Sequence, residues 1–100
     1  MNKQHPISFD KVNITGGFWK DRIALNESVT LDSVRRRFED TGRFSALSCE
    51  WKQGEPDRPH FFYDSDAAKW MEAAAYVLER KNDKQLESYV EDLIDRIERN

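Results

Sequence analysis

Two aspartates, Asp64 and Asp66, come closest in this 100-residue sequence to a catalytic pair. Cleavage of a glycosidic bond needs two carboxyl groups that face each other across the sugar, about 5–5.5 Å or 6.5–9.5 Å apart. Residues two apart at the start of a helix usually point in different directions, and aspartate is also a common helix cap. The pattern therefore favours capping, and it leaves open a contact between one carboxylate and a polar ligand.

Residue types that bind metals occur at four further positions, His5, Cys49, Glu50 and His60. None of them has a spacing, such as C-x-x-C or H-E-x-x-H, that holds two ligands on one side of an element. Cys49 also lacks a motif that would supply a base, so we do not expect it to be a nucleophile. As the single cysteine, it excludes an internal disulfide and favours a cytoplasmic location.

Composition and charge exclude several classes of partner. Charged residues make up 35% of the sequence and hydrophobic residues 38%, so the chain by itself can bury only a thin core. Three tryptophans argue against a disordered tail, and together these features indicate part of a larger domain. A net charge of −3 without a basic face excludes nucleic acid as a partner. Because no segment approaches the roughly 20 apolar residues of a membrane span, we expect no membrane partner either.

Residues 1–17 are predicted to form an arm and a short strand. The strand is expected at Val12-Asn13-Ile14-Thr15, where apolar and polar residues alternate. Gly16-Gly17 follows directly and is typical of a turn.

A helix is predicted over residues 18–42, where the apolar residues change to helical spacing. We expect an interruption near 29–31, where Thr30 or Asp32 would cap the second part. Gly42 is expected to end the helix, because glycine adopts the left-handed conformation that commonly follows a last turn.

Residues 43–63 are predicted to form an aromatic loop, because Gly54, Pro56 and Pro59 oppose regular structure. Loops of about twenty residues are uncommon inside compact domains and are often functional. The aromatic residues of this region could form a platform for a sugar ring, although packing in a core is the more common role of each. These residues are Trp51, Phe61, Phe62, Tyr63 and Trp70.

A helical hairpin is predicted over residues 64–100, so that the chain is expected to be all-α apart from the short strand. Its first helix would run from about Ala67 to Arg80, after the capping segment Asp64-Ser65-Asp66. This helix is apolar on nearly every side, which is typical of a helix buried in a large core. We therefore expect residues 67–78 to be covered by the rest of a larger fold or by an oligomer.

The second helix of the hairpin is expected to begin after Asp83, which would cap it. Its apolar residues recur every three to four positions and form one stripe. The stripe comprises Leu86, Tyr89 or Val90, Leu93, Ile94 and Ile97. Two ion pairs are expected on the outer face, Asp92 with Arg96 and Asp95 with Arg99.

Residues 62–76 resemble a signature of the form F-x-D-S-D-x-x-K-W-x-E-A-A-A-Y, which belongs to glycoside hydrolase family 127. Residues 14–22 are similar to the first strand and helix of the same family, and residues 86–96 to a later helix. The characterised members of this family are β-L-arabinofuranosidases. The resemblance implies that this chain is the N-terminal part of an (α/α)6 barrel and contains its first hairpin.

The resemblance also implies a retaining mechanism, in which a cysteine is the nucleophile and a glutamate is the acid/base. In that family the cysteine is bound to zinc together with other cysteine and glutamate ligands. Those residues lie beyond the matching region, and Cys49 does not match the cysteine motif. We therefore expect no catalytic residue and no metal ligand in this chain, and no cofactor bound by it.

Five signature positions are candidates for contact with a carbohydrate substrate, namely Phe62, Asp64, Asp66, Lys69 and Trp70. An alternative role for Lys69 is to pair with Asp64 or Asp66 and to fix the loop. The expected function is that of the N-terminal segment of a glycosidase that releases non-reducing-end L-arabinofuranose from plant-type glycans. The chain alone is expected to be inactive. The alternative is a non-catalytic helical interaction module, or the remnant of a truncated gene.

Overall fold

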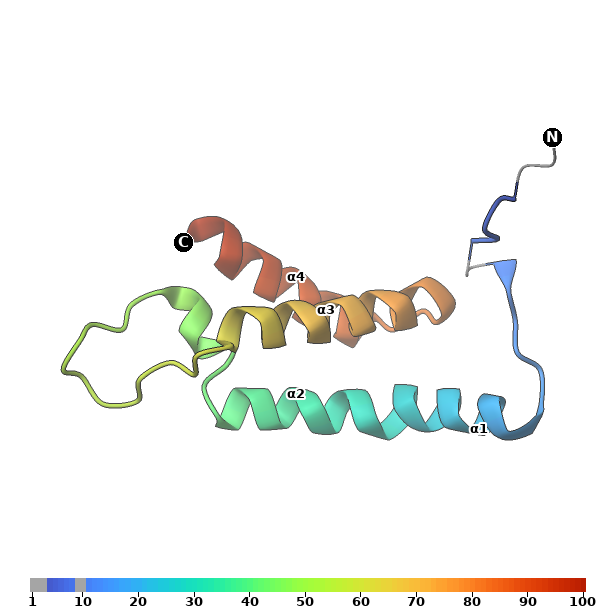
Figure 1. The fold of residues 1–100 in the computed structure, drawn as a ribbon, viewed down its shortest axis with the longest axis horizontal. Helices are drawn as coiled ribbons and strands as arrows, with labels where there is room; N and C mark the ends of the chain where they lie inside the picture. Colours follow the sequence, from blue (N-terminus) through green and yellow to red (C-terminus); the bar gives the residue numbers. More distant parts are fainter. Residues whose placement is uncertain (1–3, 9–10) are drawn as a thin grey trace.

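The structure, a computed structural model, describes residues 4–8 and 11–100 and is helical, with no strand among the described residues. Helix α1, the π-helical turn η2 and helix α2 form one continuous helical segment (Figure 1). Helix α3 runs back beside α2, and α4 runs back beside α3. The bounds are α1 Gly17–Leu25, η2 Asn26–Thr30, α2 Leu31–Asp40, the 3-10 helix η3 Ser45–Ser48, α3 Tyr63–Arg80 and α4 Lys84–Arg99. The prediction of an all-α fold is confirmed for the described part of the chain.

The short strand predicted over residues 12–15 does not form. This segment has no regular structure, and Val12 and Ile14 are 49% and 39% exposed. A strand is stabilised by pairing with a neighbour, and the described residues offer no second strand. Residues 1–3 and 9–10 of the predicted arm lie outside the described residues.

The predicted helix over 18–42 forms, but its irregular part is the π-helical turn at 26–30 rather than a capped break. Ser28 lies in this turn, and its Oγ donates a hydrogen bond to the Ala24 carbonyl at 2.7 Å. Serine that bonds back by four residues competes with the backbone ladder, which accounts for the local distortion. Thr30 makes no capping bond, so the prediction of a cap at Thr30 or Asp32 is wrong.

The end of α2 at Gly42 is confirmed. Gly42 has a φ of +79°, and its N–H donates to the Glu39 carbonyl at 3.2 Å. The N–H of Arg43 donates to the Phe38 carbonyl at 2.9 Å, which completes a Schellman motif. This turn sends the chain away from α2 and into η3.

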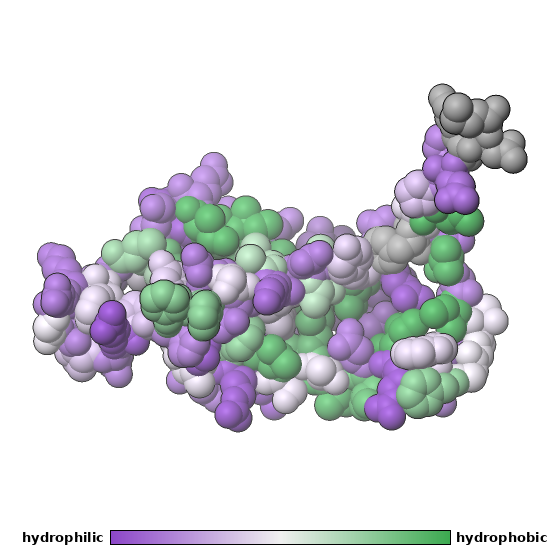
Figure 2. All heavy atoms as spheres, viewed as in Figure 1, coloured by the Kyte–Doolittle hydropathy of each residue, from purple (hydrophilic) through white to green (hydrophobic). Residues whose placement is uncertain are grey.

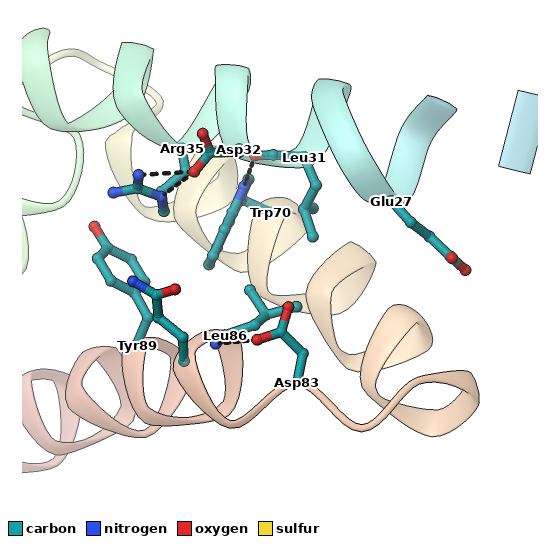
Figure 3. Close-up of a pocket in the computed structure, with 9 residues that line it drawn as sticks. Glu27, Leu31, Asp32, Arg35, Trp70, Asp83, Leu86 and Tyr89 are labelled. Atoms are coloured by element: carbon teal, nitrogen blue, oxygen red, sulfur yellow. Dashed lines mark hydrogen bonds and ion pairs between the residues drawn. The ribbon is translucent and has the colours of Figure 1, made fainter. Parts of the chain in front are cut away.

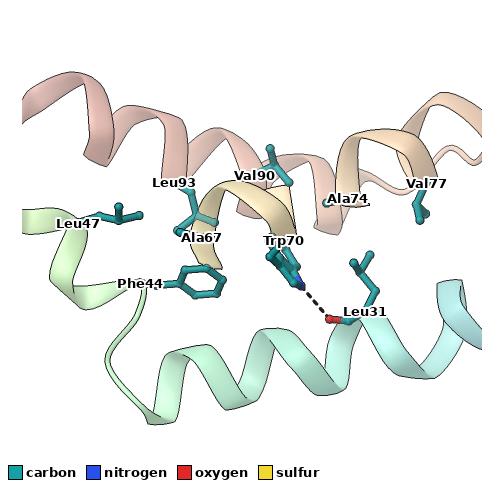
Figure 4. Close-up of a cluster of buried hydrophobic side chains, with 9 residues drawn as sticks. All are labelled: Leu31, Phe44, Leu47, Ala67, Trp70, Ala74, Val77, Val90 and Leu93. Atoms are coloured by element: carbon teal, nitrogen blue, oxygen red, sulfur yellow. Dashed lines mark hydrogen bonds between the residues drawn. The ribbon is translucent and has the colours of Figure 1, made fainter. Parts of the chain in front are cut away.

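A single core of nine buried hydrophobic residues joins α2, α3, α4 and the turn around η3 (Figure 4). Phe44 lies between Leu47 and Trp70, and its ring centroid is 5.5 Å from that of Trp70 and 5.9 Å from that of Tyr89. The core comprises Leu31, Phe44, Leu47, Ala67, Trp70, Ala74, Val77, Val90 and Leu93. No residue of α1 is buried.

Helix α3 begins at Tyr63, four positions before the predicted start at Ala67, and ends at Arg80 as predicted. Asp64 and Asp66 therefore lie in the first turn rather than at caps, so the prediction that they cap the helix is wrong. Their negative charges are favourable there because the first turn carries a partial positive charge. The position before the helix, Phe62, makes no side-chain capping bond.

The predicted cap of α4 is confirmed, because the Asp83 carboxylate accepts a hydrogen bond from the Leu86 N–H at 3.1 Å. The ion pair of Arg96 with Asp92 is also confirmed, at 2.9 Å. Arg99 instead donates to the backbone carbonyl of Asp95 at 3.3 Å. Only part of the predicted stripe is buried, since Val90 and Leu93 lie in the core while Ile94 and Ile97 are about half exposed.

The molecule is elongated, and its apolar surface is unevenly covered. The radius of gyration is 17.0 Å, against about 13 Å for a compact domain of this size. Within 67–78, one face of α3 is buried, whereas Ala68, Ala75 and Tyr76 are exposed. Figure 2 shows hydrophobic side chains on the surface over several helices. Among the described helices, none is long and apolar enough to cross a membrane.

Candidate functional site

The five candidate substrate-contacting residues lie in and just before the first two turns of α3. Phe62, Asp64 and Lys69 are exposed, with Phe62 at 55%, Asp66 is partly exposed, and Trp70 is buried. The start of α3 at Tyr63 explains why these side chains differ in exposure, because residues spaced by one and two positions on a helix face different directions. The structure therefore presents three of these side chains to solvent and directs Trp70 into the core.

Asp66 is held by Arg43 rather than by Lys69. The Nε of Arg43 lies 3.3 Å from Oδ2 of Asp66, and the two side chains are 19% and 27% exposed. The Arg43 guanidinium also lies over the Phe38 ring, 5.7 Å from its centroid. Within the described part of the chain, no ion pair joins Lys69 to Asp64 or Asp66.

Trp70 is a core residue with its polar group satisfied. Its side chain is 3% exposed, and its indole N–H donates to the Leu31 carbonyl at 2.9 Å. A buried tryptophan usually finds such a partner. In this chain Trp70 therefore ties α3 to α2, which matches the packing role that the sequence left open for each aromatic residue.

A cleft of about 200 Å³ between α2, α3 and α4 was not predicted from the sequence (Figure 3). Its lining includes the apolar side chains of Leu31, Trp70 and Leu86, and the guanidinium of Arg35. Glu27 projects away from the other labelled side chains, so the carboxylates around the cleft do not converge on one point. The remaining lining residues are Asp32, Asp83, Gln85 and Tyr89.

Arg35 organises the charges at this cleft. Its guanidinium lies 2.7 Å from Asp32 and 3.1 Å from Glu39, and its Cζ is 5.1 Å from the centroid of the Tyr89 ring. The hydrogen bond from Arg35 lowers the pKa of Asp32, and the same bond raises the pKa of Arg35. Both carboxylates lie on α2 with Arg35, and the contact with the Tyr89 ring links Arg35 to α4.

Tyr89 of α4 donates a hydrogen bond to the Glu39 carboxylate of α2. Burial and this carboxylate neighbour raise the pKa of Tyr89 to about 12. The neutral phenol is therefore the form that the fold favours. A signal was present in the sequence, since Tyr89 lies on the apolar stripe, but its partner in a different helix was not deducible.

The aromatic loop contains one regular element, the 3-10 helix η3, and is otherwise irregular. Phe61 is 84% exposed and packs edge-on against Phe62, with ring centroids 5.1 Å apart. Trp51 is anchored, because its indole N–H donates to the carbonyls of Glu55 and Pro56 at 3.2 and 3.1 Å. The rings of Phe61 and Phe62 are both exposed to solvent.

The described residues do not fit a zinc site of cysteine and glutamate ligands. No group of three or more histidine, cysteine, aspartate or glutamate side chains comes together in the described part of the chain. Cys49 is exposed, has a φ of +57°, and its Sγ lies 3.7 Å from the Leu47 carbonyl. Burial raises the pKa of the neighbouring Tyr63 phenol, and the Cys49 thiol adds to this effect.

Comparison with known proteins identifies the family of the chain. The family model described as the β-L-arabinofuranosidase GH127 catalytic domain matches residues 11–100. No curated protein and no solved structure matches the chain significantly. The match includes all the helices of the structure and the F-x-D-S-D-x-x-K-W segment at the start of α3. The chain therefore belongs to the GH127 family of glycoside hydrolases, within its catalytic domain.

Proposed function

We propose that this chain is the N-terminal part of a retaining glycosidase that releases non-reducing-end L-arabinofuranose from plant-type glycans. The observation that carries this proposal is the family match over residues 11–100. The single cysteine is consistent with the cytoplasm, which is the location that we propose. The chain by itself is expected to be inactive.

The reacting groups of this mechanism are proposed to come from outside these 100 residues. By resemblance to the family they are a cysteine nucleophile, a glutamate acid/base and a zinc ion held by cysteine and glutamate ligands. Cys49 lies in an exposed turn and outside any such ligand cluster of the described residues. No catalytic step is therefore assigned to a residue of this chain.

The part proposed for this chain is to contact the sugar and to support the residues that do. Phe62 offers an exposed ring, Asp64 offers a carboxylate that accepts hydrogen bonds from hydroxyl groups, and Lys69 offers a donor. Asp66 is engaged by Arg43, and Trp70 supports α3 from the core. Three exposed side chains near the start of α3 are therefore available to contact different parts of a ligand.

The exposed apolar surface supports a place within a larger fold. Phe18 and Trp19 of α1 are 59% and 64% exposed, and Ile94 and Ile97 of α4 are 47% and 48% exposed. Large exposed apolar areas usually mark sites of contact with other protein surface. In the proposed enzyme these faces contact further helices of the catalytic domain.

The same faces also favour the second candidate, a non-catalytic helical module that binds a partner or self-associates. The two candidate functions differ in what must cover the exposed apolar faces of the chain. An enzyme needs further catalytic-domain sequence, whereas a module needs only a surface that covers α1 and α4.

The first experiment is to sequence the DNA downstream of the Asn100 codon and to express both the chain and any extended product. We expect an open frame that includes a glutamate and several cysteines. The extended protein should release arabinose from a β-L-arabinofuranoside, and the 100-residue chain should not. Activity of the chain alone, or an extended protein that prefers another sugar, would contradict the proposal. A stop codon, together with a folded and self-associating chain, would favour the helical module.

A further inference from the structure

The contact between Arg43 and Asp66 joins the end of α2 to the first turn of α3. We propose that Arg43 is a positioning residue of the candidate site, which fixes this turn and thereby the directions of Phe62 and Asp64. The inference rests on the proposed function, because it concerns the residues proposed to contact the sugar. Neither the family match nor the signature segment assigns a role to Arg43.

Arg43 itself makes three contacts, two with Phe38 and one with Asp66. Its backbone N–H closes the Schellman motif with the Phe38 carbonyl at 2.9 Å. Its guanidinium stacks over the Phe38 ring, and its Nε meets the Asp66 carboxylate at 3.3 Å. Because both charged side chains are more than two-thirds buried, the pair is less screened by solvent and salt than an exposed pair would be.

The first turn of α3 has few other fixed points. Tyr63 packs against the core, but Phe62 precedes the helix without a capping bond. The side-chain bonds of Asp64 and Ser65 are local: Ser65 N–H donates to Asp64 at 2.8 Å, and Ser65 Oγ donates to the Phe62 carbonyl at 3.2 Å. Two side-chain contacts tie this turn to distant described segments: the bond from Arg43 to Asp66, and the bond between the Tyr63 and Cys49 side chains. The bond from Arg43 is the one that reaches the end of α2.

The Arg43–Asp66 ion pair also gives Asp64 and Asp66 different roles. Asp66 accepts a hydrogen bond from Arg43 and is committed to the fold, whereas Asp64 is exposed and accepts a hydrogen bond from the N–H of Ser65, the next residue along the chain. Lys69 is exposed as well, so it stays available as a donor. Arg43 thus forms the ion pair with Asp66 that was the alternative role expected for Lys69. The side chains of Phe62, Asp64 and Lys69 remain exposed and available to a ligand.

Amide hydrogen exchange, measured by NMR on the 100-residue chain, tests the positioning role. In Arg43→Gln the exchange rate of the Asp66 amide should rise roughly twofold to fivefold, while the rate of the Leu93 amide stays unchanged. Asp66→Asn should have the same effect, the double variant should add nothing further, and Arg43→Lys should restore part of the protection. Arg36→Gln is the matched control, because Arg36 is 70% exposed and, among the described residues, forms an ion pair with Asp32 alone. An equal rise in the exchange rates of amides throughout α3 and α4 would indicate a global loss of stability and would overturn the inference. An unchanged exchange rate of the Asp66 amide would also overturn it.

Titration of the same samples with L-arabinose separates this inference from the proposed function. Saturable shifts of the Phe62 and Asp64 amides in the natural chain, weakened severalfold in Arg43→Gln, support both. Equal affinity of the two proteins overturns the role of Arg43 and leaves the sugar contact in place. A local change in exchange without any shift by arabinose contradicts the sugar contact and supports Arg43 as the residue that fixes the turn.

Discussion

Two regions of this chain both contain tryptophan and phenylalanine but differ in how far these side chains are buried. The packed region, made of α2, η3, α3 and α4, buries Trp70 to 3% exposure against Phe44. The open region, made of α1 and residues 49–62, leaves Trp19 at 64% and Phe61 at 84% exposure. Phe18 and Trp19 pack on each other, with ring centroids 5.1 Å apart, but no residue of α1 is buried.

The difference shows that burial depends on how many elements meet, rather than on residue type. At Trp70 three helices and the turn around η3 come together, so the ring contacts neighbours on several sides. At Trp19 the apolar groove beside α3 remains open to solvent. Because burial of apolar area supplies most of the free energy of folding, the packed region should account for nearly all of the stability of this chain.

The largest effect is expected from Trp70→Ala, compared with Trp19→Ala. Removal of Trp70 should lower the free energy of unfolding by about 3–5 kcal/mol, since it leaves a cavity and an unpaired Leu31 carbonyl. The same change at Trp19 should cost about 0.5 kcal/mol or less. Urea unfolding followed by circular dichroism measures both. Similar losses in the two variants would show that α1 is covered in solution.

A second pair tests the same contrast within α4. Leu93 is fully buried and Ile94 is 47% exposed, although they are adjacent in the sequence. Leu93→Ala should cost about 2–5 kcal/mol and Ile94→Ala about 1 kcal/mol or less. The midpoint of urea unfolding distinguishes them. An equal effect of Ile94→Ala would indicate that self-association buries the outer side of α4, which a dependence of the midpoint on protein concentration would confirm.

A smaller effect is expected at the turn that leads from α2 into the core. Gly42→Ala should lower the free energy of unfolding by about 1 kcal/mol, because alanine is strained at a φ of +79°. A Cβ at this position would lie 3.5 Å from Ser45 Oγ, so space is not the cause of the loss. Gly16→Ala is the control, since Gly16 is extended with a φ of −167° and has open space around it. A thermal melt of each variant decides whether the loss is confined to Gly42.

The smallest effect concerns the pH dependence of the α2–α4 contact. The pKa of Tyr89 is raised to about 12 by burial and by Glu39, from an ordinary value of 10.0. The neutral phenol therefore contributes stability that is complete below pH 10 and is lost as the pH rises towards 12. In Tyr89→Phe the loss of unfolding free energy between pH 10 and pH 12 should be smaller by about 1 kcal/mol. This is less than the whole pKa shift would give, because the phenol is partly exposed to solvent. Unfolding titrations between pH 8 and about 12 measure it, and an identical fall in the variant would contradict the assignment.

Local features of the fold were predictable from local sequence. Gly42 ends α2 and Asp83 caps α4 as expected, because these roles need only the residue and its immediate neighbours along the chain. The prediction that Asp64 and Asp66 cap α3 was wrong, because Tyr63 packs against the core and extends the helix towards the loop. The strand at 12–15 was also wrong, because alternation of residue types cannot supply a partner strand.

For the candidate site, the sequence identified the segment from Phe62 to Trp70, and the structure showed which of its side chains are exposed and which are buried. The residues from Phe62 to Trp70 were identified by resemblance, but their different exposures depend on where α3 begins and which helix lies beside it. Arg43 was not identified, since its partner Asp66 lies 23 positions away. The cleft beside Arg35 was likewise invisible, because its lining comes from three helices.

The sequence by itself determined that this chain is helical, where its main turns lie, and to which family it belongs. Helical spacing, caps and a signature segment depend on neighbours along the chain, so they need no knowledge of the tertiary structure. Only the tertiary structure decided that Trp70 is buried while Trp19 is exposed, that Asp66 pairs with Arg43, and that Tyr89 bonds to Glu39. Each of these outcomes depends on contacts between distant segments, whose free energy is set by the full arrangement of the helices and not by any local pattern.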